Sequence, residues 1–181
     1  MSRIHWLAAP AWAAVGVSAF ASLYATPEQA AQRSFPEATQ FKDSTAQLTS
    51  EEMQAVAAAS GLPARSAAWH VQTAMKGDTV LGVVVFDSVI GKFELIDYAV
   101  GIASDGKISN VEILTYRESH GYEVRLIGWR RQFIGKGAES ALRVSDDIAN
   151  ISGATMSSTH LTDGVRRIVA VVAALKRHGK L

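Results

Sequence analysis

Hydrophobic residues recur along this chain with two periods, one typical of strands and one typical of helices. In the middle of the chain, four apolar-rich stretches alternate with short turn sequences, at 69–75, 79–89, 94–103 and 107–117. The connections Lys76-Gly77-Asp78 and Ser104-Asp105-Gly106 have the composition of hairpin turns, and Asp-Gly is a particularly strong signal. The pattern therefore predicts an antiparallel β-meander of four strands.

The 3.6-residue period predicts helices on both sides of this meander. Near the end of the chain, a core-facing stripe is formed by Leu161, Val165, Ile168, Val169, Val172 and Leu175. An earlier helix is expected over 49–61, where Thr49 and Glu52 have capping-box spacing. Residues 122–135 are also expected to be helical, and 142–144 to form a short extra strand, with 145–158 as a loop. The fold class predicted is α+β, an antiparallel β-meander packed with flanking helices.

The first part of the chain has a different character, because no Asp, Glu, Lys or Arg occurs from Ile4 to Pro27. A single Arg3 precedes this apolar run, and small residues at Ala19 and Ala21, or a later cut after Ala25, fit a signal peptide. The run is also long enough to span a bilayer. We therefore expect residues 1–25 to be a signal peptide or an N-terminal membrane anchor. The remaining residues, 26–181, are expected to lie in the periplasm or on the outer face of the cytoplasmic membrane.

The composition excludes several kinds of chemistry. The chain has no cysteine, so disulfides, thiolate nucleophiles, iron–sulfur clusters and the usual zinc sites are absent. Its five histidines lack the close spacing of a helical metal site, and no Gly-x-Ser-x-Gly motif marks a hydrolase nucleophile. The formal net charge of +1 comes without a polybasic block, so nucleic acid is not expected as a partner.

A cluster of hydroxyl residues stands out just before the C-terminal helix, in the sequence ISGATMSSTH. Five of these residues fall between Ser152 and Thr159, although a helix N-terminus needs only one hydroxyl cap, which we assign to Ser157 or Ser158. Free N–H groups and the positive end of the helix dipole also attract phosphate. Gly153 lets the backbone approach such a group closely. The stretch is therefore a candidate site for a phosphorylated ligand.

The run Ser152-Gly153-Ala154-Thr155 resembles the flavin-attachment motif of the FMN-binding domain family. That domain is shared by the C subunit of the sodium-translocating NADH:quinone oxidoreductase and the G subunit of the Rnf complex. Upstream, ESHGYE (118–123) is similar to the family's Glu-x-x-Gly loop and QFIGK (132–136) to its Gln-Phe-x-Gly-Lys segment. The resemblance covers roughly residue 35 to the C-terminus, in a chain whose apolar start is like those of the two named subunits.

This resemblance implies a cofactor and a way of attaching it. In the family, a flavin transferase takes FMN from FAD and esterifies its phosphate to the threonine hydroxyl, which falls on Thr155 here. The cofactor-binding residues implied by the motifs and their neighbours are Ser152, Gly153, Ala154, Thr155, Ser157, Ser158, Glu118, Gly121 and Tyr122. Trp129 and Phe133 are further candidates for flanking the flavin ring, and Glu118 would influence the reduction potential of the flavin.

Three functions follow from these observations. The first is an exported electron carrier, with FMN on Thr155, that works with membrane or periplasmic redox partners rather than as a stand-alone enzyme. The second is a module that binds FMN reversibly or senses it. Ala149 favours this alternative, since the family usually has aspartate three residues before the serine. The third is a structural domain in which the hydroxyl cluster only caps a helix.

Overall fold

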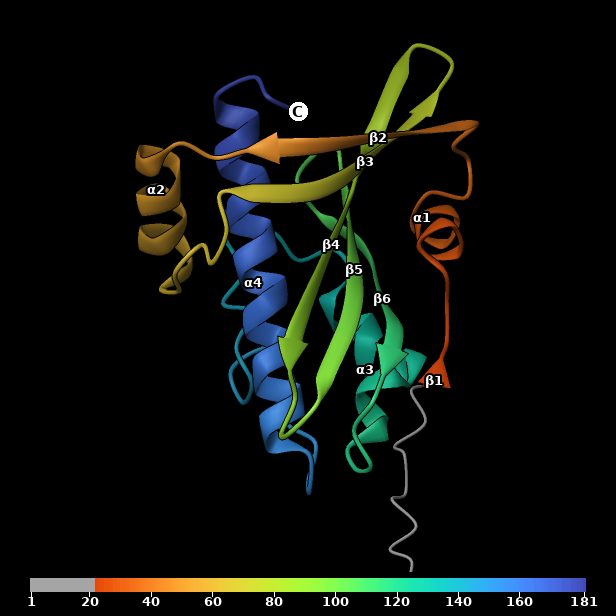
Figure 1. Cartoon of the computed structure of the whole chain (residues 1–181), viewed down its shortest axis with the longest axis vertical. Helices are drawn as coiled ribbons and strands as arrows, with labels where there is room; N and C mark the ends of the chain where they lie inside the picture. Colours follow the sequence, from red (N-terminus) through yellow and green to blue (C-terminus); the bar gives the residue numbers. More distant parts are fainter. Residues whose placement is uncertain (1–21) are drawn as a thin grey trace, which may run out of the picture.

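The computed structural model describes residues 22–181, which form a six-stranded antiparallel sheet with helices on both faces (Figure 1). The strands are β1 (Ser22–Leu23), β2 (Gln40–Gln47), β3 (Ala68–Lys76), β4 (Thr79–Ile90), β5 (Leu95–Ala103) and β6 (Ile108–Tyr116). The helices are α1 (Pro27–Ser34), α2 (Ser50–Ser60), α3 (Ile127–Arg130) and α4 (Thr155–Arg177), and the 3₁₀ turns are η1 (Tyr122–Arg125) and η2 (Arg131–Phe133). The strand order is β1-β6-β5-β4-β3-β2.

The predicted meander is confirmed as the centre of this sheet, since β3 to β6 pair in sequence order. Gly77 and Gly106 adopt left-handed backbone conformations in the two predicted hairpin turns, with φ of 59° and 87°. The sequence pattern missed β2, because Ala46 is its only buried residue and an exposed edge strand shows no apolar alternation. The fold class is therefore α+β, as expected, and the sheet is wider than the four strands that were predicted.

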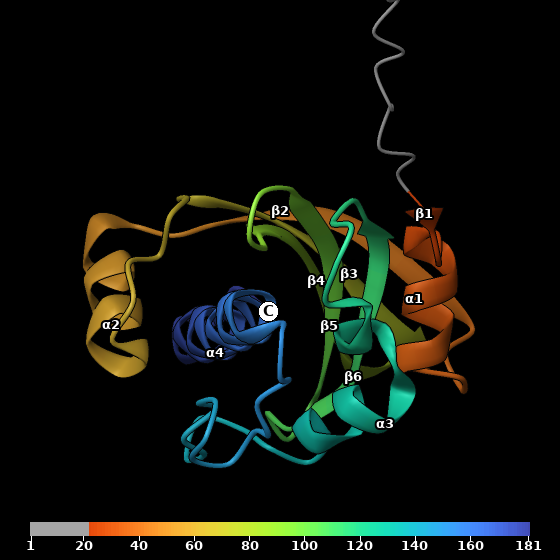
Figure 2. The ribbon, with the colours of Figure 1, turned by 90° about the horizontal axis from the view of Figure 1, so that it is seen from below.

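The sheet curls around helix α4, and Figure 2 shows this helix on the concave side with α2 beyond it. The main core fills the space between the concave face, α2 and α4. A smaller core, built on Ala30, Ala31 and Phe35, lies between α1 and the opposite face. Each face of the central strands thus buries apolar side chains, which explains their nearly continuous hydrophobic sequences.

Helix α4 packs closely against the sheet at Gly164. A Cβ atom at this position would lie 2.1 Å from the Tyr98 hydroxyl oxygen and 3.0 Å from Val89. Tyr98 is fully buried and donates a hydrogen bond to Asp87 Oδ2 at 2.9 Å, so its ring has no free space into which it could move. Gly164 therefore sets the distance between α4 and the sheet.

Gly164→Ala is expected to lower the free energy of unfolding by about 1–3 kcal/mol, because overpacking forces the helix or Tyr98 to shift. The measurement is the midpoint of urea unfolding. Gly128→Ala is the matched control, since Gly128 is also helical but has no atom within 4 Å of the position of an added Cβ. Equal midpoints for the two variants would contradict this packing argument.

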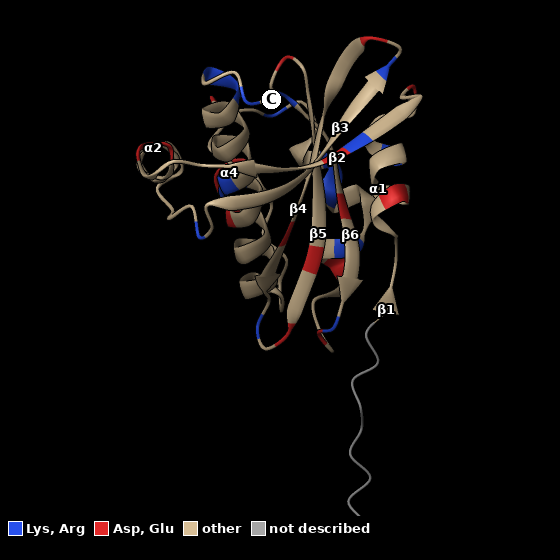
Figure 3. Cartoon of the chain, turned by 45° about the horizontal axis from the view of Figure 1, so that its top comes forward, with Lys and Arg blue, Asp and Glu red and all other residues tan. Residues whose placement is uncertain are grey.

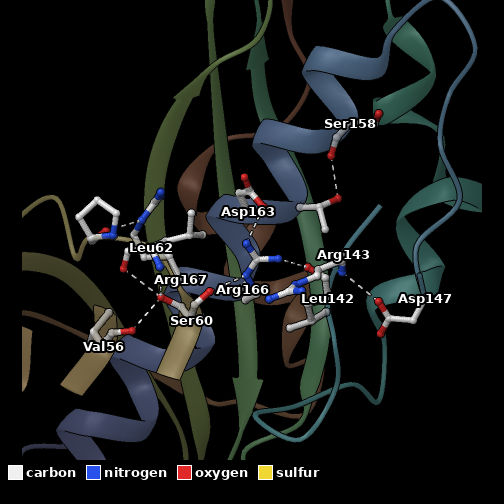
Figure 4. A network of polar contacts seen from close by, with 12 residues as sticks. Val56, Ser60, Leu62, Leu142, Arg143, Asp147, Ser158, Asp163, Arg166 and Arg167 are labelled. Carbon is white, nitrogen blue, oxygen red and sulfur yellow. Dashed lines mark hydrogen bonds and ion pairs between the residues drawn. The ribbon is translucent and has the colours of Figure 1, made fainter. Parts of the chain in front are cut away.

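Two arginines of α4 hold the helix against its neighbours through backbone carbonyls (Figure 4). Arg166 donates to the carbonyls of Ser60 at 2.9 Å and Leu142 at 3.0 Å, and it pairs with Asp163 at 2.9 Å. Arg167 Nε donates to the Pro63 carbonyl at 2.9 Å. These contacts join α4 to the end of α2 and to the loop before α4, so they oppose sliding of the helix along its axis.

Three local predictions are wrong. Residues 122–133 form η1, the four-residue α3 and η2 instead of one helix. Residues 142–144 form no strand beyond a single bridge between Val144 and Ile148. Helix α4 begins at Thr155, inside the stretch expected to be a loop, because the apolar stripe that identified the helix starts only at Leu161.

Helix α1 was not predicted, although its start has a recognisable signal. Thr26 accepts a hydrogen bond from the backbone N–H of Gln29, whose side chain in turn accepts from the backbone N–H of Thr26. This capping box, with Pro27 at the first helical position, was not recognised because the sequence that follows it is polar and shows no apolar stripe.

The predicted signal peptide or anchor lies in residues 1–21 for most of its length, outside the described part of the chain. Its last residues are described, and Ser22 and Leu23 pair with Tyr116 and Thr115 of β6. Among the helices of residues 22–181, none combines the length and apolar character needed to cross a bilayer.

Candidate functional site

A hollow of about 510 Å³ opens at the end of the molecule where α4 begins. Three segments surround it: the turn between β4 and β5, the loop after β6, and the first turn of α4. Its lining residues are Lys92, Phe93, Glu118, Ser119, His120, Gly153, Ala154, Thr155, Met156 and Ser157. The fold therefore brings the SGAT and ESHG motifs, 31 or more residues apart in sequence, to one hollow.

Thr155 is the first residue of α4, and its side chain is exposed at this hollow. The Nδ2 group of Asn150 donates a hydrogen bond to Thr155 Oγ1 at 3.3 Å, which leaves the hydroxyl proton free. Ser158 Oγ lies 3.1 Å from Asn150 Oδ1 and thereby orients the amide. The threonine hydroxyl is thus both accessible and held by a neighbour.

The predicted cap at Ser157 or Ser158 is wrong, because both residues lie inside α4. The N-cap position is Ala154, which offers no side-chain hydrogen bond to the helix. Ser158 is fully buried, and its hydroxyl lies near the carbonyls of Ala154 and Thr155. The first N–H groups of α4 therefore lack a side-chain cap next to Thr155, and the positive end of the helix dipole faces the hollow.

Two glycines allow the walls of the hollow to pack closely. A Cβ at Gly121 would lie 2.7 Å from Ala154 Cβ, and φ of this glycine is +77°. A Cβ at Gly91 would lie 2.6 Å from Glu118 Oε1 and 3.0 Å from Ser157 Oγ. Gly121 therefore lies behind the SGAT motif, as a packing residue rather than as part of the open surface.

Glu118 supports the turn between β4 and β5. Its Oε1 atom accepts hydrogen bonds from the backbone N–H groups of Phe93 at 2.5 Å and Glu94 at 2.9 Å. His160 Nδ1 lies 2.7 Å from the Ile90 carbonyl on the other side of the same turn. This turn carries Phe93, whose side chain is 74% exposed at the mouth of the hollow. Glu118 thus positions an aromatic ring beside the candidate site.

Tyr116 lies beneath the hollow and remains a neutral phenol. Burial raises the pKa of Tyr116, and the nearby Glu118 and Glu123 carboxylates raise it further, against a hydrogen bond with Ser157 that lowers it. Its hydroxyl donates to the carbonyl of His120. The loop after β6 is therefore held by a proton donor that does not ionise near neutral pH.

The remaining aromatic candidates lie away from the hollow. Tyr122 is 54% exposed, but its ring lies near Arg125 and does not line the hollow. Phe133 is fully buried and packs edge-on against Trp129, with 5.3 Å between ring centroids. Ser152 is exposed next to the hollow, whose lining starts at Gly153.

The QFIGK segment acts as a tether for the loop that precedes the SGAT motif. Gln132 Oε1 accepts from the Ala149 backbone N–H at 2.8 Å, and Trp129 Nε1 donates to the Ala149 carbonyl at 2.7 Å. Lys136 pairs with Asp147 at 3.1 Å. Although partial burial opposes it, hydrogen bonding to the Arg143 N–H and to Lys136 lowers the pKa of Asp147. Asp147 is thus engaged in contacts within the loop.

Sequence reasoning missed several residues of the hollow, namely Lys92, Phe93, Ser119, His120, Met156 and the adjacent Asn150. Lys92 and Phe93 belong to a hairpin turn, and no local pattern distinguishes a turn beside a site from any other turn. Asn150 could have been considered, since it stands two residues before the motif. Within residues 22–181, no group of three or more metal-ligating side chains comes together.

Comparison with known proteins agrees with this geometry. Residues 91–170, which include all three motifs, match the family model described as FMN-binding domain. A search of solved structures finds the crystal structure of NqrC from Shewanella oneidensis, with a TM-score of 0.50 and 14% sequence identity over 77% of this chain and 85% of that one. No curated protein matches the chain. The predicted resemblance to the FMN-binding domain family is thus confirmed over residues 91–170, and the fold is similar to that of NqrC.

Proposed function

We propose that this protein is an electron carrier that holds FMN through a phosphoester bond to Thr155. The observation that supports this most directly is the exposed Thr155 hydroxyl at the mouth of the hollow, beside the uncapped end of α4. A phosphate on this oxygen would lie near free backbone N–H groups and the positive end of the helix dipole.

The hollow also fits the rest of an FMN molecule. Its volume of about 510 Å³ is within the range of small-molecule sites. Phe93 and Met156 offer exposed apolar surface for a flat ring, and nothing lies within 4 Å of an added Cβ at Gly153, so the approach to Thr155 is open. When bound, FMN supplies the redox chemistry, while these residues orient it and limit its contact with water.

The attachment requires a flavin transferase with FAD as donor. A bond forms between Thr155 Oγ1 and the phosphorus of the FMN portion, the diphosphate bond of FAD breaks, and AMP leaves with the hydroxyl proton. We place the protein in the periplasm or on the outer face of the cytoplasmic membrane, on the basis of the uncharged run from Ile4 to Pro27. Its redox partners are then membrane or periplasmic proteins.

The test is the intact mass of the protein produced in an exporting host with and without a flavin transferase. Our proposal predicts that the protein mass increases by the mass of one FMN less one water, and only when the transferase is present. An unmodified mass with yellow colour that is released on denaturation would instead support reversible binding, which Ala149 favours. Colourless, unmodified protein from the transferase host would contradict both functions.

Asn150→Ala is expected to slow flavin attachment several-fold, because the amide that holds Thr155 Oγ1 is lost and the side chain can rotate away. Attachment is followed as the modified fraction over time at a fixed transferase concentration. Asn110→Ala is the matched control, since Asn110 lies on β6, outside both the motif and the hollow. If both variants are modified at the wild-type rate, Asn150 has no role in attachment.

A further inference from the structure

Exposed apolar side chains concentrate at one end of the molecule. Of the eleven large hydrophobic side chains that are exposed among the described residues, nine lie on or directly after β1, at the β4–β5 hairpin end, in η1 with α3, or in the first turn of α4. These segments all lie at the lower end in Figure 1, opposite the C-terminus. Contiguous exposed apolar surface usually marks a binding surface.

Part of this surface forms a continuous patch, which we define as Leu23, Tyr24, Tyr122, Leu126 and Ile127. Their side chains are 39–68% exposed. Arg125 connects them, because its guanidinium lies 4.4 Å from the centroid of the Tyr24 ring and 5.4 Å from that of Tyr122. A hollow of about 380 Å³ runs between Tyr24, Leu126 and Ile127.

The charged groups around this patch are mainly basic. Arg33, Arg125 and Arg130 border the same hollow, where the single acidic residue is Glu112. Glu112 is paired with both Arg33 at 3.5 Å and Arg130 at 3.1 Å. The lining of this hollow therefore carries more basic than acidic side chains, with Glu123 as a further acidic residue next to Tyr122, whereas basic and acidic positions are interspersed over the molecule as a whole (Figure 3).

The patch begins within the last part of the uncharged N-terminal run, which extends from Ile4 to Pro27. Residues 4–21 contain no Asp, Glu, Lys or Arg, and they lead directly into Ser22 and Leu23. Because β1 is paired with β6, a segment held in a bilayer just before residue 22 would keep the patch near the lipid headgroups. Tyrosine and arginine are the side chains that such an interface favours, next to aliphatic residues that enter the acyl region.

We propose that the patch formed by Leu23, Tyr24, Tyr122, Leu126 and Ile127 rests on an anionic phospholipid bilayer when the full chain is membrane-bound. Arg33 and the partly exposed Arg125 then face the negative lipid headgroups, whereas Arg130 stays buried beneath them. The hollow at Thr155 lies at the same end of the molecule, so this orientation holds it close to the membrane surface (Figure 1).

The test uses the absence of cysteine, which allows a single spin label to be placed without a background. The full chain with Ile127→Cys carries a nitroxide label and is reconstituted into phosphatidylcholine–phosphatidylglycerol vesicles. Collisions of the label with oxygen and with a water-soluble nickel chelate are compared. Val80→Cys is the matched control, because Val80 is 45% exposed in the β3–β4 hairpin, away from the patch.

We expect the logarithm of the oxygen-to-nickel accessibility ratio to be positive at position 127 and negative at position 80. Leu126→Cys should give the same sign as Ile127→Cys, which guards against a local effect of one label. Negative values at both patch positions would overturn the proposal. Shielding of both positions from oxygen and nickel alike would also overturn it, since a protein partner would then cover the patch. The labels report the same result with or without FMN, so failure here leaves the proposed function untouched.

Discussion

Thr155→Val is expected to abolish the covalent FMN adduct, in a host where the wild-type protein is fully modified. Valine keeps the shape of threonine but removes the hydroxyl oxygen that the phosphorus must bind. The fold should be unaffected, because Thr155 is exposed and its hydroxyl only accepts a hydrogen bond from Asn150. The intact mass and the flavin absorbance of denatured protein measure the loss.

Two controls make this result specific. Thr155→Ser keeps a hydroxyl at the same position and should retain the adduct. Thr159→Val removes a hydroxyl from the next turn of α4, outside the hollow, and should be modified like the wild type. An adduct that persists in Thr155→Val and disappears in Thr159→Val would move the attachment site and overturn our assignment.

Phe133→Ala is expected to destabilise the protein by about 3–5 kcal/mol, the usual cost of removing a fully buried aromatic side chain. Phe133 has no exposed surface, and its ring packs edge-on against Trp129. Trp129 in turn donates to the Ala149 carbonyl, so the loop before Thr155 should also loosen. Urea unfolding followed by tryptophan fluorescence measures the change in the free energy of unfolding.

The neighbouring residue provides the control. Ile134 is 49% exposed, so Ile134→Ala should change the free energy of unfolding by about 0.5 kcal/mol or less. Similar losses in both variants would show that Phe133 does not contribute through burial. Unchanged attachment kinetics in a folded Phe133→Ala protein would show that the loop is held without it.

Sequence alone was sufficient for the centre of the fold, where local signals and tertiary packing agree. The β4 and β5 strands are largely apolar because both faces are covered, and turns such as Ser104-Asp105-Gly106 end them clearly. Helix α2 was expected from Thr49 and Glu52, and the Thr49 N–H indeed donates to Glu52 Oε2 at 2.6 Å. The ends of such elements are marked by turn or capping residues in the local sequence.

The failures occur where structure depends on distant contacts. The segment 122–133 breaks into short turns because Arg130 is pulled into the core, where it pairs with Glu112 and donates to the Val111 carbonyl. The periodicity of hydrophobic residues in a short segment cannot reveal such a long-range contact. The start of α4 was missed for a related reason, since its first turn exposes Thr155 and Met156 and so lacks the apolar stripe.

The candidate site, too, was predicted only in part from the sequence. Its motif residues Gly153, Ala154, Thr155 and Glu118 were named from sequence, and the fold brings them to one hollow. The role of Glu118 as a support for the Phe93 turn could not be predicted, because it joins backbone atoms 24 and 25 residues away. Motifs point to candidate residues, whereas only the fold shows what those residues touch.

The polar strand β2 has a consequence for how the molecule behaves in a crowded compartment. Within residues 22–181 it pairs on one side only, with β3, so its other side offers backbone groups to which a second chain could add a strand. Lys42 and Asp43 place opposite charges in the middle of this border. A second copy of β2 aligned antiparallel through this pair would bring unlike charges together, whereas a parallel, in-register alignment would bring like charges together. Since each copy has only this one open side on β2, such pairing ends at two copies and does not extend into a fibre through this edge.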